Sequence, residues 1–210
     1  MPHRDWNESY SSGEVPWDTG KPDELLVDTV RNGTIRPGHV LEVGCGTGTN
    51  AIWLASQGFT VLGIDVAPLA IEKARKKATE VGADCRFEVL DLLKDQQIPG
   101  GPYDFVFDRG CFHIFDSAEE RTRFAQRVEA LLKPGGQWLS LIGSTEGPER
   151  EFGPPRRSAR DVTNAVEPAM EILQLHSAVF HADMPEAAAA WYCLSRKRSI
   201  PAVPSTRRVA

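Results

Sequence analysis

The chain has 210 residues, of which 41% are apolar and 25% are charged. These fractions are those of an ordinary globular protein with enough residues to bury a core, so they exclude a disordered chain. The net charge of −5, with scattered basic residues, does not suit a nucleic-acid scaffold, which usually presents a basic face to the phosphates.

The cysteines and the apolar runs indicate in which cellular compartment the protein is expected. Cys45, Cys85, Cys111 and Cys193 lie far apart and form neither a zinc-ligand pattern nor a dense disulfide framework, so we expect reduced thiols and no metal. The first ten residues lack the apolar core of a signal peptide, and no apolar run is long enough to span a bilayer. We expect a cytoplasmic monomer or homodimer that binds neither membrane nor nucleic acid.

The hydrophobic pattern alternates between helices and strands. A helix is predicted over 22–32, ending at Gly33. The predicted strands are 39–43, 60–64, 86–90, 103–108 and 137–142, and the helices between them are 49–57, 68–81 and 118–132. Two further apolar runs, 171–178 and 189–194, are joined through 183–185 and indicate an antiparallel closing pair. Strands that alternate with helices imply βαβ units and a mainly parallel sheet.

A glycine-rich loop, E-V-G-C-G-T-G-T-N, follows the first strand. Ligands of a doubly wound sheet bind beyond the carboxyl ends of its strands, where glycines allow a close approach. A dinucleotide fingerprint requires glycine or alanine three places after its second glycine, and this chain has Thr49 there. The acid at Glu42 suits a cationic ligand such as S-adenosylmethionine (SAM) better than a pyrophosphate. The contacts predicted from this loop are Glu42, Gly44, Cys45, Gly46, Gly48 and Asn50.

The ends of the second and third strands extend this prediction. Asp65 follows Gly44 by about 20 residues, where a carboxylate accepts hydrogen bonds from a ribose diol, although it would also cap the next helix. Val66 would flank an adenine ring. Asp91 would accept a hydrogen bond from the adenine amino group, with the Leu92 N–H reaching a ring nitrogen, but an ordinary Asp turn explains Asp91 nearly as well.

Five motifs in order resemble those of class I SAM-dependent methyltransferases. They span residues 39–142 and read V-L-E-V-G-C-G-T-G, G-I-D, D-L-L, Y-D-F-V-F-D-R-G-C-F-H and L-L-K-P-G-G. The resemblance implies an α/β, Rossmann-like, doubly wound sheet of seven strands in the order 3-2-1-4-5-7-6. Its last strand would be antiparallel, and helices would cover both faces. SAM would be the methyl donor and S-adenosylhomocysteine the product.

The N-terminal segment narrows the resemblance. Residues 15–22, V-P-W-D-T-G-K-P, follow Trp6 and Tyr10 and resemble the opening of the thiopurine and thiol S-methyltransferase group, which includes tellurite-resistance methyltransferases. In that group the segment folds over SAM and substrate. Trp17 would therefore stack on the sulfonium or anchor the segment. We expect one domain over 1–198, comprising a lid and helix (1–33), a SAM-binding core (39–142) and a substrate-covering, sheet-closing part (143–196), before a disordered tail (199–210).

The fourth strand ends at the face where a substrate would meet the methyl group. There we expect Asp108 to contact the cofactor and to take part in catalysis with its neighbours. His113 would act as a base, orient the nucleophile or simply pack beside phenylalanines. Arg109 would anchor an anionic substrate, hold the N-terminal segment or form an ion pair. Arg156 and Arg157 would select an anionic substrate or remain exposed surface charges.

These motifs favour methyl transfer to a small-molecule nucleophile. A thiol or related soft atom is the preferred acceptor, because a thiol with a pKa of roughly 8.5 needs little help from a base, and alignment for in-line displacement supplies most of the catalysis. The alternative is an O- or N-methyltransferase acting on a small aromatic metabolite. An NAD-dependent oxidoreductase and a non-catalytic SAM-binding protein are weaker alternatives.

Overall fold

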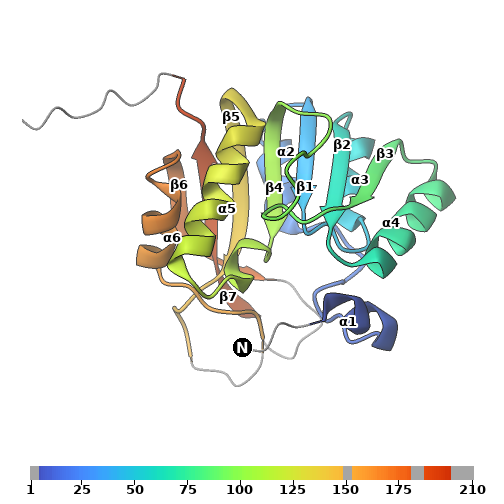
Figure 1. Ribbon diagram of the computed structural model, residues 1–210, viewed down its shortest axis with the longest axis horizontal. Helices are drawn as coiled ribbons and strands as arrows, with labels where there is room; N and C mark the ends of the chain where they lie inside the picture. The colour runs from blue at the N-terminus through green and yellow to red at the C-terminus, as the bar shows by residue number, and fades with distance from the viewer. Residues whose placement is uncertain (1–4, 149–152, 181–186, 200–210) are drawn as a thin grey trace, which may run out of the picture.

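Seven strands form one twisted sheet in the order β3-β2-β1-β4-β5-β7-β6 (Figure 1). The computed structural model describes residues 5–148, 153–180 and 187–199, so the predicted turn at 183–185 and the tail from residue 200 lie outside it. The strands are β1 (His39–Val43), β2 (Thr60–Asp65), β3 (Cys85–Val89), β4 (Tyr103–Arg109), β5 (Leu132–Gly143), β6 (Glu171–Phe180) and β7 (Ala188–Arg196). Only β7 runs antiparallel to its neighbours, β5 and β6, which confirms the predicted fold class and strand order.

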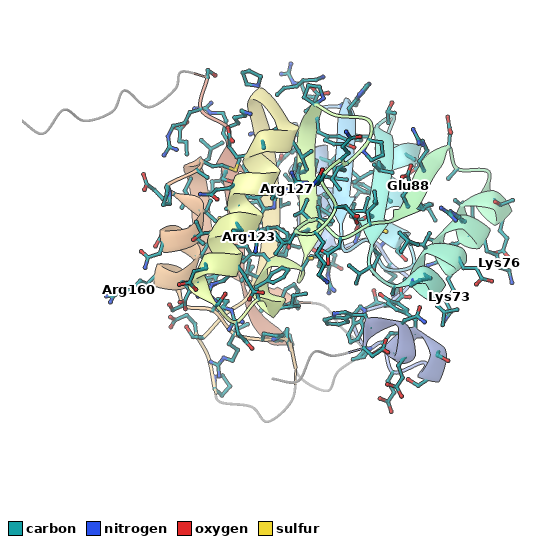
Figure 2. All side chains as sticks on the ribbon, in the orientation of Figure 1. Lys73, Lys76, Glu88, Arg123, Arg127 and Arg160 are labelled. Carbon is teal, nitrogen blue, oxygen red and sulfur yellow. The ribbon has the colours of Figure 1, made fainter. Side chains whose placement is uncertain are left out.

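Helices cover both faces of this sheet. They are α1 (Trp6–Ser12), α2 (Glu24–Arg31), α3 (Thr49–Ser56), α4 (Pro68–Val81), α5 (Ala118–Leu131) and α6 (Ala159–Val166), with a short 3-10 helix η1 (Phe112–Ile114). Helices α2, α3 and α4 pack on one face, and α5 and α6 pack on the other. Charged side chains such as Lys76 on α4 and Arg123 on α5 point away from the sheet (Figure 2). Among the described residues, no helix combines the length and apolarity needed to span a bilayer.

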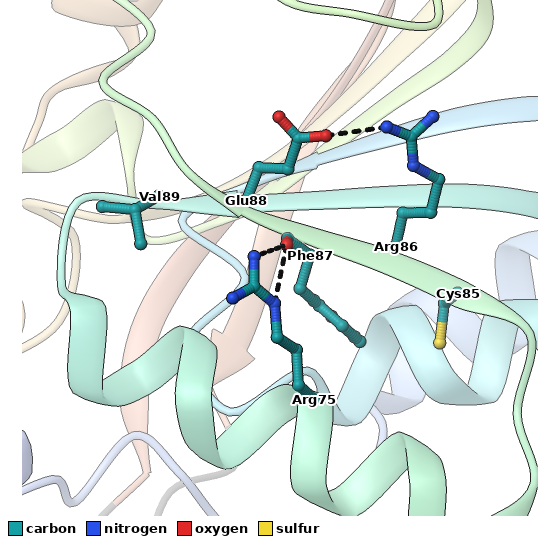
Figure 3. A pocket seen from close by; sticks show the side chains of 6 residues that line it. All are labelled: Arg75, Cys85, Arg86, Phe87, Glu88 and Val89. Atoms are coloured by element: carbon teal, nitrogen blue, oxygen red, sulfur yellow. Dashed lines mark hydrogen bonds and ion pairs between the residues drawn. The ribbon is translucent and has the colours of Figure 1, made fainter.

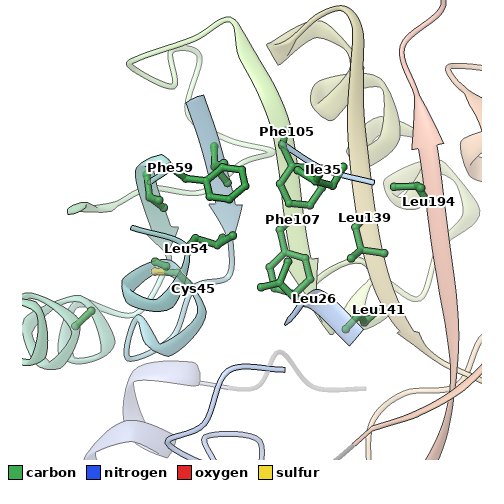
Figure 4. Packing of buried hydrophobic residues seen from close by; sticks show 14 of the residues in the cluster. Leu26, Ile35, Cys45, Leu54, Phe59, Phe105, Phe107, Leu139, Leu141 and Leu194 are labelled. Atoms are coloured by element: carbon green, nitrogen blue, oxygen red, sulfur yellow. The ribbon is translucent and has the colours of Figure 1, made fainter. Parts of the chain in front are cut away.

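The core forms because alternate residues of each buried strand face opposite layers. Phe105 and Phe107 of β4 contact one layer together with Leu26 of α2 (Figure 4), whereas Val106 contacts the other. Both phenylalanines are at most 1% exposed, and burying each such side chain contributes roughly 1.5–3 kcal/mol. Asp108 follows on the same side of β4 as Val106, so its carboxylate is carried into the layer beneath α5.

Strand β3 ends the sheet, and its outer edge is covered by a basic side chain. The Arg75 guanidinium of α4 donates two hydrogen bonds, of 3.1 and 2.5 Å, to the Phe87 carbonyl, and Arg86 pairs with Glu88 at 2.9 Å (Figure 3). The hydrogen bonds to the Phe87 carbonyl and the charged side chains along this edge oppose pairing of β3 with another strand. The shallow depression at this edge is therefore explained by the fold.

Two local features differ from the prediction. Helix α1 was not predicted, although Asp5 caps its first turn by accepting from Glu8 N–H at 3.0 Å and Gly13 ends it at φ +81°. Strand β5 begins at Leu132 rather than at the predicted residue 137, because residues 133–136 bulge out between the paired positions Leu132 and Gln137. Helix α1 lies beyond the carboxyl ends of β1 and β2, next to α4, and thus faces the ligand side of the sheet (Figure 1).

Candidate active site

A cavity of about 950 Å³ opens at the carboxyl ends of β1, β2 and β4. Its walls come from the glycine loop, the segments after β2, β3 and β4, part of the loop before α6, and an N-terminal arm that we define as residues 5–23. Acidic and basic side chains line the cavity, and so do the aromatic rings of the arm, Trp6, Tyr10 and Trp17. The cavity occupies the position at which doubly wound sheets bind their ligands.

The glycine loop brings bare backbone to this cavity. Gly44, Gly46 and Gly48 have backbone φ values of +68°, +53° and +78°, which residues with a side chain rarely adopt. A Cβ at Gly46 would lie 2.8 Å from the Tyr10 hydroxyl, and one at Gly48 would lie 2.7 Å from the Phe87 ring. Only glycine therefore allows the arm above and β3 below to close around the loop.

Glu42 is a buried acid at the end of β1. It is 1% exposed, and one carboxylate oxygen, Oε1, accepts from Asn50 Nδ2 at 3.1 Å. The other oxygen, Oε2, has no hydrogen-bond partner. Burial raises the pKa of Glu42 to about 8. Asn50 also accepts from the Asp23 N–H at 2.9 Å, so its amide holds both the acid and the arm in place.

Asp65 closes β2 and holds two loops. Its carboxylate oxygens accept from Gly46 N–H and from Ala67 N–H, each at 2.9 Å. The side chain lines the cavity while remaining 8% exposed, and burial raises its pKa. Asp65 is not the cap of α4, whose N-cap is Ala67, and the bond to Gly46 ties Asp65 to the glycine loop.

The end of β3 contributes a third acid. Asp91 Oδ1 accepts from the N–H groups of Leu93 and Lys94 at 2.9 and 3.2 Å, an Asx turn, and Oδ2 pairs with Lys94 at 3.0 Å. Asp91, buried Leu92 and half-exposed Val66 all line the cavity. Asp91 therefore forms the turn that the sequence offered as one alternative, and its place in the cavity wall leaves the predicted contact with adenine open to test.

Asp108 lies outside the cavity wall, fully buried beneath α5. Its oxygens accept from Trp138 Nε1 at 2.9 Å and from the N–H groups of Cys111 and Phe112 at 3.1 and 3.0 Å. Burial raises its pKa to about 6. This geometry does not match the expected cofactor contact or catalytic role: Asp108 shapes the turn that presents Cys111 and His113 instead.

Arg109 joins β4 to the arm. Its guanidinium lies 2.6 Å from an Asp23 carboxylate oxygen and donates to the Trp17 carbonyl at 3.3 Å, while stacking 5.0 Å from the Phe180 ring centroid. The sequence left three roles open for Arg109: an anchor for an anionic substrate, a support for the N-terminal segment, or an ion pair. In the structure an ion pair forms, and its partner is Asp23. The contact holds the arm, and Arg109 also lines the cavity.

The aromatic part of the arm packs edge-on around Trp17. Its ring centroid lies 5.7 Å from Trp6 and 6.3 Å from Tyr10, and its indole N–H donates to the Tyr10 hydroxyl at 3.2 Å. All three rings line the cavity. Burial raises the pKa of Tyr10 well above that of a free phenol, so its hydroxyl stays protonated. Trp17 thus anchors the arm and faces the cavity at once.

His113 lines the cavity opposite the arm and is 5% exposed. Its Nδ1 accepts from the Gly143 N–H at 2.7 Å, and its ring meets the Phe180 ring edge-on at 5.9 Å. Neighbouring Cys111 also lines the cavity, and burial raises the pKa values of Cys111 and Cys45 well above that of a free thiol. Both cysteines are therefore thiols rather than nucleophilic thiolates, as the sequence indicated for Cys111.

Arg156 and Arg157 are absent from the cavity wall, contrary to their predicted role in substrate selection. Arg156 donates to the carbonyls of Ser144, Thr145, Glu146 and Gly147, and Arg157 pairs with Asp116 at 2.8 Å. The Arg156 guanidinium holds the loop after β5, and the Arg157 guanidinium holds the segment between η1 and α5. The residues of the loop before α6 that do line the cavity are Gly153, Pro154 and Pro155.

Some site residues were missed by the sequence analysis. Asp18 accepts from the Thr47 hydroxyl at 2.7 Å, and Lys77 donates to that hydroxyl at 2.6 Å and to Thr49 at 2.9 Å. Asp23, buried and paired with Arg109, caps α2 by accepting from Leu25 N–H at 3.0 Å. The cap was detectable, because Asp23 is an N-cap residue type two places before Leu25, the first apolar position of the predicted helix. The described residues contain no group of three or more potential metal ligands.

The fold and this cavity define a Rossmann-like α/β protein with one ligand site built on a glycine loop. Residues 40–136 match the family described as a methyltransferase domain. The chain is 35% identical over 150 residues to probable thiol methyltransferase 2 of Arabidopsis thaliana, covering 71% of this chain and 65% of that protein. It is 29% identical over 157 residues to thiocyanate methyltransferase 1 of Brassica oleracea, covering 73% and 67%.

A solved structure has a similar fold. The structure described as conversion of a disulfide bond into a thioacetal group during echinomycin biosynthesis is 28% identical, with a TM-score of 0.78 over 89% of this chain and 86% of that one. The chain is therefore similar in sequence to methyltransferases, and residues 40–136 match their domain. The match spans just under two thirds of the Arabidopsis protein's length.

Proposed function

We propose that this chain transfers a methyl group from SAM to a small-molecule nucleophile, with a thiol or related soft atom as the preferred acceptor. The observation that carries the proposal is Glu42: a buried carboxylate whose Oε2 has no partner lines the cavity beside the glycine loop. An unpaired buried acid is costly unless a cation accompanies it. The ammonium group of SAM is such a cation, so the residues present fit this cofactor.

The other walls suit the rest of the same molecule. The bare backbone at Gly44 and Gly46 allows close approach of its amino-acid part, and Asp65 retains lone pairs to accept hydrogen bonds from a ribose diol. Val66, Leu92 and Asp91 would flank and recognise the adenine. Cys45, Gly48 and Asn50 would act through the shape of the loop, with Asn50 fixing Glu42.

The acceptor would lie between the arm and the end of β4. When bound, SAM supplies a methyl group already activated by its sulfonium. The chain would then exclude water with Trp17 and the arm, hold that arm shut through Arg109, and orient the acceptor beside His113. Two relatives, a probable thiol methyltransferase and a thiocyanate methyltransferase, support a soft acceptor.

The test is the mass of the product after incubation with SAM and a mixed library of thiols, phenols and amines. We expect S-methylated products and S-adenosylhomocysteine, lost together in a variant with Asp65→Ala. Methylation confined to phenols or amines would replace the thiol assignment with an O- or N-methyltransferase. Calorimetric binding of NAD without binding of S-adenosylhomocysteine would overturn the proposal as a whole.

A further inference from the structure

Helix α4 supports the arm with two lysines that lie one turn apart. Lys73 Nζ donates to the Tyr10 carbonyl at 2.6 Å, and Lys77 Nζ donates to the Thr47 hydroxyl at 2.6 Å. Lys73 lies on the side of α4 that faces α1, whereas Lys76 points away from the sheet (Figure 2). Because residues four apart share one helix face, both supporting lysines lie on the same side of α4.

One of these lysines reaches the arm through a threonine of the glycine loop. The Thr47 hydroxyl accepts from Lys77 and lies 2.7 Å from an Asp18 carboxylate oxygen. Because an ammonium group can only donate and a carboxylate can only accept, the hydroxyl proton must point at Asp18. Lys77, Thr47 and Asp18 thus form a directed chain of hydrogen bonds from α4 through the glycine loop to the arm, which we call the Thr47 bridge.

All the hydrogen bonds of the Thr47 bridge are made within the protein. Thr47 is buried, and Lys77 also donates to the hydroxyl of Thr49, the first residue of α3, at 2.9 Å. Asp18, Thr47 and Thr49 line the cavity, whereas Lys77 does not. Since none of these bonds uses a ligand atom, formation of the Thr47 bridge does not depend on a bound ligand.

The Thr47 bridge joins the two sides of the predicted cofactor site. Thr47 lies in the middle of the glycine loop, and Asp18 directly follows Trp17 in the arm. The Tyr10 hydroxyl of the arm lies against the same loop, 2.8 Å from the position that a Cβ of Gly46 would take. A ligand seated on the glycine loop is therefore covered by the arm, and the arm must lift to let it pass.

We propose that Lys77 is a positioning residue that keeps the arm closed over the glycine loop through Thr47 and Asp18, and so sets the rates at which the cofactor enters and its product leaves. This inference rests on the proposed function of the same site. A bond made both with and without ligand changes the fraction of time for which the arm is open, and so scales entry and exit alike. The affinity then stays constant, whereas losing a direct ligand contact changes the exit rate and the affinity together.

Stopped-flow binding of S-adenosylhomocysteine to the whole chain, followed by tryptophan fluorescence, measures both rates. Lys77→Met keeps the apolar stem and removes the donor. We expect the association and dissociation rate constants both to rise about tenfold, as for the loss of one charge-assisted hydrogen bond, while Kd changes less than about twofold. Unchanged rates, or faster dissociation alone with weaker binding, would overturn the inference.

Lys76→Met is the matched control for this variant. Lys76 neighbours Lys77 on α4, and its 3.9 Å pair with Glu80 joins side chains that are 78% and 62% exposed. Exposed pairs of this kind contribute little, so both rate constants should equal those of the wild type. An acceleration as large as that of Lys77→Met would mean that lost charge on α4, and not the Thr47 bridge, changes the rates.

Variants of Thr47 test whether the effect of Lys77 passes through the hydroxyl. Thr47→Val keeps the shape of the side chain without the hydroxyl, whereas Thr47→Ser keeps the hydroxyl. We expect Thr47→Val to reproduce the rates of Lys77→Met and Thr47→Ser to stay within about twofold of the wild type. The double variant Lys77→Met with Thr47→Val should be no faster than either single variant. Multiplying accelerations would show two independent contacts and contradict the bridge.

Hydrogen exchange keeps this inference apart from the proposed function, because it needs no ligand. The Asp23 N–H donates to Asn50 across the boundary between arm and glycine loop at 2.9 Å, so it exchanges when the arm lifts. We expect this N–H to exchange about tenfold faster in Lys77→Met than in Lys76→Met, with exchange of the core amide of Val106 unchanged. Equal exchange at Asp23 would overturn the inference. If S-adenosylhomocysteine does not bind at all, the proposed function fails, while exchange at Asp23 still decides the role of Lys77.

Discussion

The two walls of the cavity are built by different means. The wall beneath the cofactor comes from residues near one another in the sequence: Glu42 and Asn50 are joined by one side-chain hydrogen bond, and Asp65 is tied to Gly46. The wall at the acceptor side comes from distant segments, as the 2.6 Å ion pair between Asp23 and Arg109 illustrates. A βαβ unit fixes the first wall, whereas packing of the arm against β4 creates the second.

The two walls also differ in how far they fall within the segment that matches the methyltransferase family. The cofactor wall uses backbone turns, which need particular residues at fixed spacing, and it accordingly lies within the segment that matches the methyltransferase family, 40–136. The arm and the loop before α6 lie outside that segment. Of the parts that would surround the acceptor, the end of β4 therefore lies within the matched segment, whereas the arm and the loop before α6 do not.

The largest effect should come from breaking the contact between the walls. Arg109→Met leaves the Asp23 carboxylate, 1% exposed, without its cation, and we expect the free energy of unfolding to fall by about 3 kcal/mol. Urea denaturation measures it. Arg196→Met is the matched control, because its pair with Glu171 is 44% and 47% exposed and contributes about 0–1 kcal/mol.

The double variant Arg109→Met with Asp23→Asn should recover part of the loss, since the neutral amide needs no cation. If Arg109→Met costs no more than Arg196→Met, the ion pair does not hold the arm, and the contrast between the two walls would lose its main support.

Asp65→Ala tests the cofactor wall. It removes the acceptor of the Gly46 N–H together with the predicted ribose partner, so we expect the affinity for S-adenosylhomocysteine to fall about 100-fold, as measured by isothermal titration calorimetry. Asp84→Ala is the control: that acid is exposed at the amino end of β3, away from the cavity, and its loss should leave the affinity unchanged. An unchanged affinity for Asp65→Ala would mean that the ribose partner is misassigned.

Protonation of Glu42 should make ligand binding at the same wall depend on pH. Its pKa of about 8 means that the carboxyl is largely protonated at pH 7 in the unliganded protein, and a ligand ammonium beside it would favour ionisation. We expect binding of S-adenosylhomocysteine at pH 7 to release close to one proton at Glu42, as measured by calorimetry in buffers of different ionisation heat. Glu42→Gln should abolish that release and weaken binding about tenfold.

The stability of the unliganded protein should also depend on pH through the carboxyl group of Glu42. An acid whose pKa is higher in the folded state than in the unfolded state binds a proton only in the folded state between the two values. Its contribution is therefore complete below pH 4.5 and is lost as pH rises to about 8. Denaturation of the wild type across that range should show this decline more steeply than Glu42→Gln; parallel curves would contradict the raised pKa.

The sequence predicted where Glu42, the glycines and Asp65 lie, because spacing alone places them at the ends of adjacent strands, where they line the cavity. Their contacts with SAM stay a prediction. The sequence predicted the acceptor wall poorly, because nothing local links Asp23 to Arg109 or Asp18 to Thr47. Asp108 looked like a site residue from its place at the end of β4. The alternation of β4 instead carries its side chain beneath α5, where Trp138 donates to it.

The same reasoning explains the arginines before α6. Two cations in a loop near the acceptor resemble an anion site, but carbonyl groups of a tight loop compete for guanidinium donors as effectively as a ligand does. Arg156 has four such carbonyl partners, all in residues 144–147. Sequence cannot weigh that competition, since it depends on how the backbone after β5 turns.

Arg156→Ala should therefore have the smallest effect on catalysis. Because its guanidinium holds the loop at 144–147 and lies outside the cavity wall, we expect the KM for the acceptor to change less than about twofold and the stability to fall by about 1 kcal/mol. Trp17→Ala, which removes a ring that lines the cavity, should raise that KM at least about tenfold under the same conditions. A rise in KM for Arg156→Ala as large as that for Trp17→Ala would return Arg156 to the acceptor site, and the acceptor wall would then extend across the loop before α6.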